Sequence, residues 1–432
     1  MSDEQRVTLT EALELGVAAH QAGEHKKAGY IYGEVLKAAP DNVDALQFMG
    51  VLLHQSRDNA AALERLARAA ELAPNSAGVF MNYGNVLLEA GQTDAATDAF
   101  RRLLELAPEH AQAWNNMGVL LRAQGRTELA EEALRKAIAL NPEDAGAYHN
   151  LGNLLIGTGA IEEAVECGLK AITLLPGSDV SKKLLGIAYA HLGETEKAKA
   201  VFAQWLAEDP GNPTAEHHLA ALGDTMPDRA SDLYVETTFD NFAASFDAKL
   251  ENLGYRAPEL VADELRALLA GRTARVLDVG CGTGLVGPLV RDLSDELVGI
   301  DLSGKMLDRA RARGHYDRLE KAEFVGYLSA VDAPFGAIIA ADALCYVGPM
   351  EAFAQNAFAA SLPGAPFVGT FEADAEGRDV FLTRSGRYTH GKDYLTRTFE
   401  AAGFTVTAVK PEPLRMEQGR PVAGFVLCAV SR

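Results

Sequence analysis

The sequence is poor in cysteine, in long apolar runs and in positive charge. It has only four cysteines among 432 residues, and none of them forms a CxxC pair. This scatter argues against a disulfide framework and a structural zinc site, so we predict no metal. No apolar run reaches the ~18 residues that cross a bilayer, and the first residues lack the features of a secretory signal. We therefore expect a cytoplasmic protein that does not associate with a membrane.

The shortage of positive charge excludes a further class of partner. Lysine and arginine total 40 against 60 aspartate and glutamate residues, and both halves of the chain are acidic. A field of that sign repels phosphate backbones, so we expect no nucleic-acid partner. The chain is also longer than the ~250 to 300 residues at which a single core stops growing. At least two domains are expected.

Small and rigid residues recur every 34 residues through the first half of the chain. The glycines are Gly16, Gly50, Gly84, Gly118, Gly152 and Gly186; the alanines are Ala28, Ala62, Ala96, Ala130, Ala164 and Ala198; the prolines are Pro40, Pro74, Pro108, Pro142, Pro176 and Pro210. Glycine and alanine let two helices approach closely, and proline ends the second helix. Six antiparallel helical pairs are predicted. The pattern resembles the tetratricopeptide family over roughly residues 9–212.

That resemblance implies an all-α tetratricopeptide solenoid, whose concave groove binds a protein or peptide partner. Asn82, Asn116 and Asn150 recur at the same 34-residue step, and Asn85 and Asn153 follow two of them. A ladder of carboxamides offers both donors and acceptors to an extended backbone, which makes these five residues candidate partner contacts. Asparagine is also common at these positions in the family, and both interpretations stay open.

The repeat register ends near residue 212. Residues 213–223 predict one more helix, capped by Thr214, and residues 224–228 are polar and contain a proline, as in a linker. We therefore expect six repeats in residues 1–212, a capping helix and linker in residues 213–227, and a second domain in residues 228–432.

The second domain alternates apolar strand-like segments with helical patterns, which is typical of an α/β doubly wound, Rossmann-like sheet. Seven strands are predicted, at residues 275–279, 296–300, 323–327, 336–340, 366–371, 404–409 and 424–430. No helix separates the last two, so the terminal strand should run antiparallel.

A glycine-rich segment follows the first predicted strand. It contains Gly280, Gly282 and Gly284, and the second strand ends at Asp301. Glycines at this place let a ligand approach the backbone, and a carboxylate ~20 residues further on accepts ribose hydroxyls. We predict a nucleoside-cofactor site that includes these four residues and the adjacent Leu302.

The glycine spacing leaves two cofactor classes open, because Gly282, Gly284 and Gly287 also satisfy the GxGxxG fingerprint of NAD-binding domains. Asp278 favours S-adenosylmethionine. A carboxylate ~4 Å from a pyrophosphate costs ~4 kcal/mol at an effective dielectric of 20, whereas the ammonium and sulfonium of adenosylmethionine are attracted to it.

The segment around Asp278 resembles motif I of the class I methyltransferases. Upstream, the pattern FDxxAxxFD at residues 239–247 is similar to a segment that folds over the cofactor in such enzymes, which implies that Phe246 covers adenosylmethionine. A plain amphipathic helix packed on the sheet is the other interpretation. Over nearly its whole length the chain resembles the bacterial tetratricopeptide-fused methyltransferases, which implies methyl transfer to O or N of an acceptor that the sequence does not identify.

One departure from the resemblance keeps other functions open. Related domains carry an aspartate after the third strand to meet the adenine amino group, and here Gly326, Tyr327 and Leu328 stand at the predicted place. An interaction scaffold with a degenerate methyltransferase fold is therefore one alternative, and an NAD-binding enzyme is another.

The acceptor side is assigned from position in the fold. The carboxyl ends of the strands hold the site in doubly wound sheets. Asp342 follows the fourth predicted strand, which makes it a candidate cofactor contact, and a loop with Tyr388 and His390 follows the fifth. We predict that Tyr388 and His390 orient or deprotonate the acceptor, with Asp342 as the next candidate. Alternatively, His390 caps a helix or faces solvent.

Overall fold

A computed structural model of the chain describes residues 8–223, 226–243, 246–247, 250, 253–417 and 420–432. The chain divides into two compact units, Met1–Leu154 and Leu155–Arg432, and the division falls within one helix of the repeats. Residues 224 and 225 of the predicted linker lie outside the described residues. Within the described ranges, no helix combines the length and the apolarity needed to cross a membrane.

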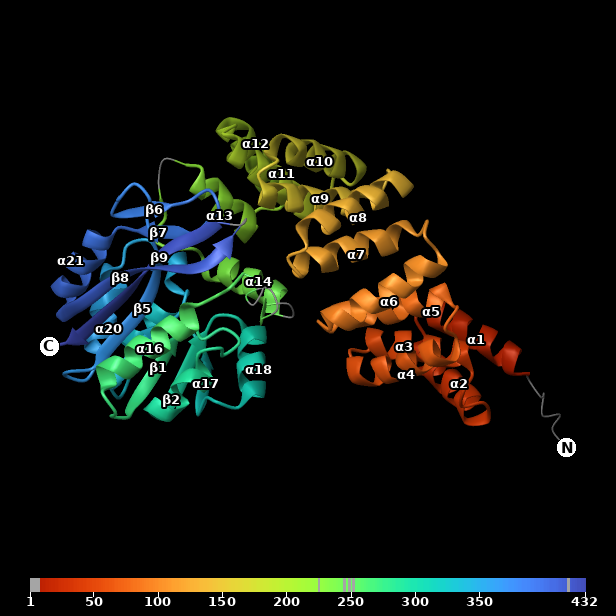
Figure 1. Cartoon of the computed structure of the whole chain (residues 1–432), viewed down its shortest axis with the longest axis horizontal. Coiled ribbons are helices and arrows are strands. Elements are labelled where there is room, and N and C mark those ends of the chain that lie inside the picture. Colours follow the sequence, from red (N-terminus) through yellow and green to blue (C-terminus); the bar gives the residue numbers. More distant parts are fainter. Residues whose placement is uncertain (1–7, 224–225, 244–245, 248–249, 251–252, 418–419) are drawn as a thin grey trace. The chain divides into compact units, whose positions relative to one another are not determined.

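The repeat region consists of the six predicted helical pairs (Figure 1). Their helices are α1 (Leu9–Gln21), α2 (His25–Ala38), α3 (Val43–Gln55), α4 (Asn59–Leu72), α5 (Ala77–Glu89), α6 (Thr93–Leu106), α7 (Ala111–Ala123), α8 (Thr127–Leu140), α9 (Ala145–Thr158), α10 (Ile161–Leu174), α11 (Asp179–Leu192) and α12 (Thr195–Glu208). The division between the two units falls within α9, so the last repeats belong to the same unit as the α/β domain.

The recurring glycines allow the close approach that their spacing predicts. A Cβ built on Gly118 would lie 2.5 Å from Cγ of Leu134, and one on Gly186 would lie 2.4 Å from Cζ of Phe202. In both pairs the large side chain stands sixteen residues after the glycine and is completely buried. Every alanine of the second series is also completely buried, so each helical pair is closed by a small residue on both helices.

Helix α13 (Pro213–Ala221) follows the sixth pair, as predicted. Its cap is Asn212 and not Thr214, because Oδ1 of Asn212 accepts the backbone N–H groups of Thr214 and Ala215, both at 3.1 Å. The prediction of a threonine cap was wrong by two residues, since a proline at the first helical position shifts the cap in front of it.

The α/β domain is built on a seven-stranded sheet with the order β3-β2-β1-β4-β5-β9-β8. Its strands are β1 (Ala274–Val279), β2 (Ser294–Asp301), β3 (Arg318–Lys321), β4 (Ala337–Ala340), β5 (Pro366–Glu372), β8 (Phe404–Glu417) and β9 (Arg420–Ser431). The first five are parallel, and β9 lies antiparallel between β5 and β8. The predicted antiparallel terminal strand is confirmed.

Helices cover both faces of this sheet. They are α14 (Asp232–Phe242), α16 (Ala257–Leu269), α17 (Gly287–Val290), α18 (Gly304–Arg313), α19 (Phe324–Ser329), α20 (Glu351–Ala359) and α21 (Lys392–Ala402). Along β1, Val276 packs with α16 in one core and Leu277 packs with α20 and α21 in the other. Successive side chains point to opposite faces of a strand, so two buried faces explain why the central strands are apolar throughout.

The predicted third strand was wrong. Residues 323–327 begin the short helix α19, because the Glu323 carboxylate caps it by accepting the N–H groups of Val325 at 3.0 Å and Gly326 at 2.7 Å. The true strand, β3, is polar because it forms an edge of the sheet. Apolar content alone therefore pointed to the wrong segment.

A small hairpin outside the main sheet was also missed. Its strands are β6 (Val380–Leu382) and β7 (Tyr388–His390), in the segment predicted to be a loop. Three-residue strands leave little periodicity to detect in a sequence.

The helical contacts at the recurring glycines yield a test. We expect Gly118→Ala to lower the free energy of unfolding by about 1 to 3 kcal/mol, because its Cβ would press on Leu134 and on the Ala130 carbonyl. Gly157→Ala, in α9, is the matched control, because nothing lies within 4 Å of a Cβ there. Urea unfolding followed by far-UV circular dichroism measures both variants. Equal midpoints for Gly118→Ala and the original chain would contradict the packing account.

Candidate active site

A cavity of about 300 Å³ opens at the carboxyl ends of the parallel strands. Its lining includes the loop after β1, the ends of β2 and β4, and part of α14. Strand order reverses between β1 and β4, and doubly wound sheets bind ligands at such a reversal. The volume lies at the lower end of the ~300 to 1,000 Å³ typical of small-molecule pockets.

The glycine loop takes backbone conformations that other residues rarely adopt. Gly280, Gly282 and Gly284 all have positive φ, of 68°, 54° and 83°. A Cβ on Gly280 would lie 2.3 Å from Cβ of Ala343, whereas a Cβ on Gly282 would meet only Phe246, at 3.9 Å. The backbone at Gly282 is thus open toward the cavity, as expected of a loop that a ligand approaches closely.

Asp301, at the end of β2, lies beside this loop and lines the cavity with Leu302. Its carboxylate accepts the N–H of Gly282 at 3.0 Å and the N–H of Ser303 at 2.8 Å. Burial raises the pKa of Asp301, and the two backbone N–H groups oppose this shift. The predicted association of the glycine loop with a carboxylate is therefore present.

Asp278 occupies a different position from the one its predicted role suggests. It is 1% exposed and does not belong to the cavity lining. Its Oδ2 accepts the hydroxyl of Tyr316 at 2.6 Å, and its Oδ1 is buried with no hydrogen-bond partner in the described part of the chain. Burial raises the pKa of Asp278 to about 7, against the opposing effect of the Tyr316 hydrogen bond. Direct contact between Asp278 and a cofactor stays a prediction.

The residues that follow the third strand differ from those predicted from the sequence. Because β3 ends at Lys321, the next residues are Ala322 and Glu323, and both line the cavity. Tyr327 lies within α19 and packs against the sheet core. The expected departure at residues 326–328 was therefore wrong, and a carboxylate does follow the third strand.

The described residues of the FDxxAxxFD segment, 239–243, 246 and 247, contribute aromatic side chains to the cavity wall, and residues 244 and 245 lie outside the described part of the chain. Phe239 and Phe246 both line the cavity, with ring centroids 6.0 Å apart in an edge-to-face arrangement. Oδ1 of Asp240 accepts the hydroxyl of Ser303 at 2.6 Å, and Oδ1 of Asp247 accepts the hydroxyl of Thr283 at 2.5 Å. The two aspartates thus attach the aromatic cover to the loops that follow β2 and β1.

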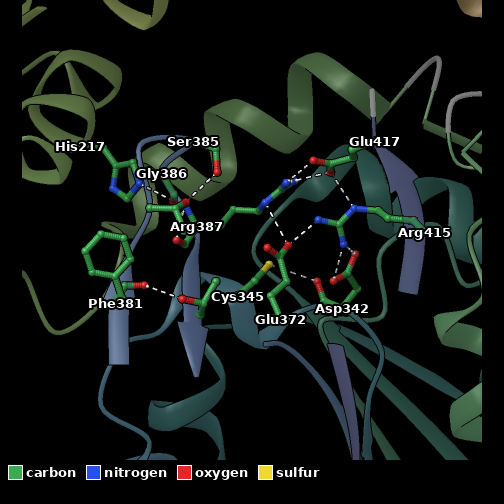
Figure 2. Close-up of polar contacts among 12 residues, drawn as sticks. His217, Asp342, Cys345, Glu372, Phe381, Ser385, Gly386, Arg387, Arg415 and Glu417 are labelled. Atoms are coloured by element: carbon green, nitrogen blue, oxygen red, sulfur yellow. Dashed lines mark hydrogen bonds and ion pairs between the residues drawn. The ribbon is translucent and has the colours of Figure 1, made fainter. Parts of the chain in front are cut away.

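Part of the cavity wall carries a largely buried ionic network, drawn in Figure 2. Arg415 is 3% exposed in its side chain and donates to Asp342 at 3.0 and 2.7 Å and to Glu417 at 2.7 Å, and it also contacts Glu372. Arg387 donates to both carboxylate oxygens of Glu417 at 2.7 Å, and its Nε lies 3.0 Å from Glu372. Two guanidinium groups therefore hold three carboxylates together.

Asp342 stands at the cavity edge of this network. Its φ is 56°, which is unusual for a residue other than glycine, and its N–H donates to the hydroxyl of Thr370 at 2.7 Å. Burial raises the pKa of Asp342 to about 6, and Arg415 is the main opposing charge. Asp342, Cys345 and Glu372 bring potential ligand atoms within 4.8 Å of one another, but both carboxylates already bind the Arg415 guanidinium.

Tyr388 and His390 do not line the cavity. Both are completely buried in β7; the Tyr388 hydroxyl donates to the Pro227 carbonyl at 2.8 Å, and Nε2 of His390 lies 2.9 Å from the Gly348 carbonyl. Burial lowers the pKa of His390 and raises that of Tyr388. The geometry gives no support to their predicted contact with an acceptor, because both polar groups bind backbone carbonyls.

Three of the five candidate asparagines form hydrogen-bonded pairs between neighbouring repeats. Nδ2 of Asn116 donates to Oδ1 of Asn85 at 2.9 Å, and Nδ2 of Asn150 donates to Asn115 at the same distance. Asn153 contacts His149 at 2.7 Å within its own helix. Asn82 is half-buried on α5. Asn115 was missed as a member, although it stands next to Asn116.

The main residues that sequence reasoning missed are Arg387, Arg415, Glu417 and Glu323. One usable signal existed for two of them. Arg415 and Glu417 are two residues apart, which places them on one face of a strand, but the segment was interpreted as a connection and not as part of β8. Nothing local distinguishes Arg387 from an exposed loop arginine.

The buried carboxyl of Asp278 yields a pH prediction. Its pKa rises from an ordinary 3.8 to about 7 on folding, so between these values the native chain holds a proton that the unfolded chain has lost. Stability from this group therefore falls as the pH rises from about 4 to 7. In Asp278→Asn that fall should vanish, whereas Asp332→Asn, at an exposed site, should keep it. Calorimetric unfolding of the three proteins across this range provides the measurement, and parallel pH profiles would refute the assignment.

Comparisons with known proteins cover both parts of the chain. The model of a methyltransferase domain matches residues 253–409. The model of the tetratricopeptide repeat matches residues 19–79, and that of the middle TPR-like domain of cilia and flagella-associated protein 70 matches residues 55–208. A crystal structure of the MamA protein shares 28% sequence identity, covers 38% of this chain and 91% of its own, and has a TM-score of 0.36.

Two curated relatives match parts of the chain. Methyltransferase-like protein 27 of Homo sapiens is 41% identical over 97 residues, which is 22% of this chain and 38% of the relative. A probable S-adenosylmethionine-dependent methyltransferase of Mycolicibacterium smegmatis is 27% identical over 160 residues, which is 36% of this chain and 61% of the relative. The chain thus spans less than two thirds of either relative. It joins an N-terminal tetratricopeptide-repeat array to a C-terminal methyltransferase domain.

Proposed function

We propose that the chain is an S-adenosylmethionine-dependent methyltransferase whose repeats recruit a protein partner or substrate. The main support is the pair of carboxylates, Asp301 and Glu323, which line one cavity at the carboxyl ends of two neighbouring strands, β2 and β3. Asp301 is suited to accept the ribose hydroxyls and Glu323 to accept the adenine amino group. Gly282 leaves room between the loop and the cavity for the rest of the cofactor.

The helix after the glycine loop favours adenosylmethionine over NAD. A dinucleotide site holds its pyrophosphate at the N-terminus of a long helix, where the dipole and free N–H groups favour an anion. Here α17 has four residues and contains Pro288 near its start. A single turn with a missing donor is a weak anion site, and adenosylmethionine has no phosphate to place there.

The proposed methyl transfer depends mainly on the positioning of the acceptor relative to the cofactor. Bound adenosylmethionine supplies an electrophilic methyl group on its sulfonium. The aromatic cover of Phe239 and Phe246 excludes water, and the ionic network fixes another part of the wall. Alignment of an acceptor with the methyl group in such a site supplies most of the acceleration.

We assign proton removal from the acceptor to Asp342. Asp342 lines the cavity, and its pKa is about 6. At neutral pH its carboxylate is therefore mostly ionised, and its pKa is close to the range that suits a general base. Arg415 keeps the carboxylate oriented through two hydrogen bonds. This assignment replaces Tyr388 and His390, which do not reach the cavity.

The cofactor assignment is tested by calorimetric titration. Asp301→Ala should lose about 3 kcal/mol of affinity for adenosylmethionine, roughly 100-fold, because two hydrogen bonds to a charged acceptor disappear. Asp308→Asn, an exposed carboxylate on α18, should bind like the original chain. Unchanged affinity in Asp301→Ala, or tighter binding of NAD than of adenosylmethionine by the original chain, would refute the proposal.

We propose that the paired asparagines of the repeats bind an extended peptide segment. Their mutual hydrogen bonds hold the carboxamides in place, so that little side-chain freedom is lost on binding. This role was predicted for Asn82, Asn85, Asn116, Asn150 and Asn153.

A selected peptide provides the test of this groove. A peptide chosen from a random displayed library by the full chain should bind more weakly to the double variant Asn116→Ala, Asn150→Ala, while adenosylmethionine affinity stays the same. Gln21→Ala removes an exposed carboxamide outside the ladder and should leave peptide binding unchanged. Fluorescence anisotropy measures the binding, and equal peptide affinities in all three proteins would exclude the asparagines as contacts.

A further inference from the structure

The β6–β7 hairpin connects the cavity with the end of the repeat region. All of its contacts described here lie within the unit Leu155–Arg432. His217 of α13 lies 2.7 Å through Nε2 from the carbonyl of Gly386, in the hairpin turn, as Figure 2 shows. Nη1 of Arg384, in the same turn, donates to the carbonyl of Ala190 at the end of α11 at 2.8 Å. Two independent hydrogen bonds therefore hold one turn against the last repeat and its capping helix.

The contact between His217 and Gly386 is buried and closely packed. His217 is 5% exposed, and its ring stacks on Tyr234 of α14 with centroids 4.0 Å apart. Gly386 has a φ of 82°, and a Cβ there would lie 2.9 Å from Nε2 of His217. Since a carbonyl only accepts, Nε2 carries the proton. Any side chain at position 386 would break the contact.

The residue after Gly386 enters the active site. Arg387 lines the cavity and binds Glu417 and Glu372, which Arg415 also binds. Arg415 in turn holds Asp342. The contacts thus run without a gap from the repeat cap, through the turn and two guanidinium groups, to the carboxylate at the cavity edge.

The hairpin needs outside support to keep Arg387 in place. Its strands have three residues each, and an isolated two-stranded hairpin of that size is marginal in water. The partly buried guanidinium of Arg387, however, requires accurate geometry, because misplaced partners leave desolvated charge unpaired. The repeat cap is one of the elements that supply this support.

We propose that His217 is a positioning residue that holds Arg387 in place at the acceptor side of the cavity. The capping helix at the end of the repeat array thereby helps to form the methyl-transfer site. The inference rests on the proposed methyltransferase function, but the experiment that tests it does not require methyl transfer. It places a functional residue in front of the predicted domain boundary at residues 227–228.

The titration of Asp342 reports the position of Arg387 without an acceptor. The charged and titratable groups that face Asp342 come from two strands and three connecting segments: Glu372 on β5, Arg415 and Glu417 on β8, Cys345 and Tyr346 after β4, Arg387 in the hairpin turn and Tyr255 before α16. Arg387 lowers the pKa of Asp342, so displacement of Arg387 should raise it above its value of about 6.

The experiment uses the full chain labelled with ¹³C at the aspartate carboxyls, with Asp342→Asn identifying the resonance. His217→Phe keeps the stacked ring on Tyr234 but cannot donate to Gly386, whereas His217→Gln keeps an N–H donor. Arg387→Ala marks the full loss of the Arg387 charge. Arg397→Ala, which removes an exposed arginine paired with Asp379, is the control for charge loss elsewhere.

We expect His217→Phe to shift the pKa of Asp342 upward, toward the value in Arg387→Ala, and we expect His217→Gln and Arg397→Ala to leave it unchanged. Adenosylmethionine affinity should stay the same in His217→Phe, because phenylalanine keeps a ring stacked on Tyr234 and so keeps α14 in place. A normal Asp342 pKa in His217→Phe, alongside a raised one in Arg387→Ala, would overturn the proposal. Failure of the original chain to bind adenosylmethionine would instead count against the proposed function and would leave the Asp342 result readable.

Discussion

The proposed acceptor side of the cavity depends on the ionic network around Arg415. One guanidinium meets carboxylates that follow β4, end β5 and end β8, and Arg387 joins the network from the hairpin. Breaking a buried pair by removal of one partner typically costs ~3 to 5 kcal/mol, because the other charge stays buried and uncompensated. The network therefore holds the ends of β4, β5 and β8 and the hairpin turn in fixed positions. These four segments shape the cavity wall that we propose an acceptor contacts.

The two halves of the cavity are built in different ways. The proposed cofactor half contains one local unit, in which the glycine loop after β1 and the carboxylate at the end of β2 lie side by side in a parallel pair, and Phe239 of α14 covers it. The proposed acceptor half is assembled from elements distant in sequence. Both halves contact helix α13, the first through the stacking of His217 on Tyr234 of α14 and the second through the hairpin turn.

This difference also explains how much could be predicted from the sequence. The repeats were predicted in full, because Gly118 and Leu134 contact each other within one 34-residue unit and the same spacing recurs six times. The glycine loop and Asp301 were found for the same reason, since their spacing is local. Arg387 and Arg415 were not found, because their partners are between two and 73 residues away and no local pattern links them. His390 was assigned to an open loop, because a strand of only three residues leaves no clear pattern in the sequence. In the structure it is completely buried in β7.

The central claim is that this cavity transfers a methyl group from adenosylmethionine. The most direct measurement incubates the full chain with methyl-labelled adenosylmethionine and with the macromolecular and small-molecule fractions of a cell extract, and then follows the label. The account predicts label in at least one fraction with the original chain, and its loss in Asp301→Ala. Binding of adenosylmethionine without transfer to either fraction would contradict the claim and would favour a scaffold that carries a degenerate methyltransferase fold.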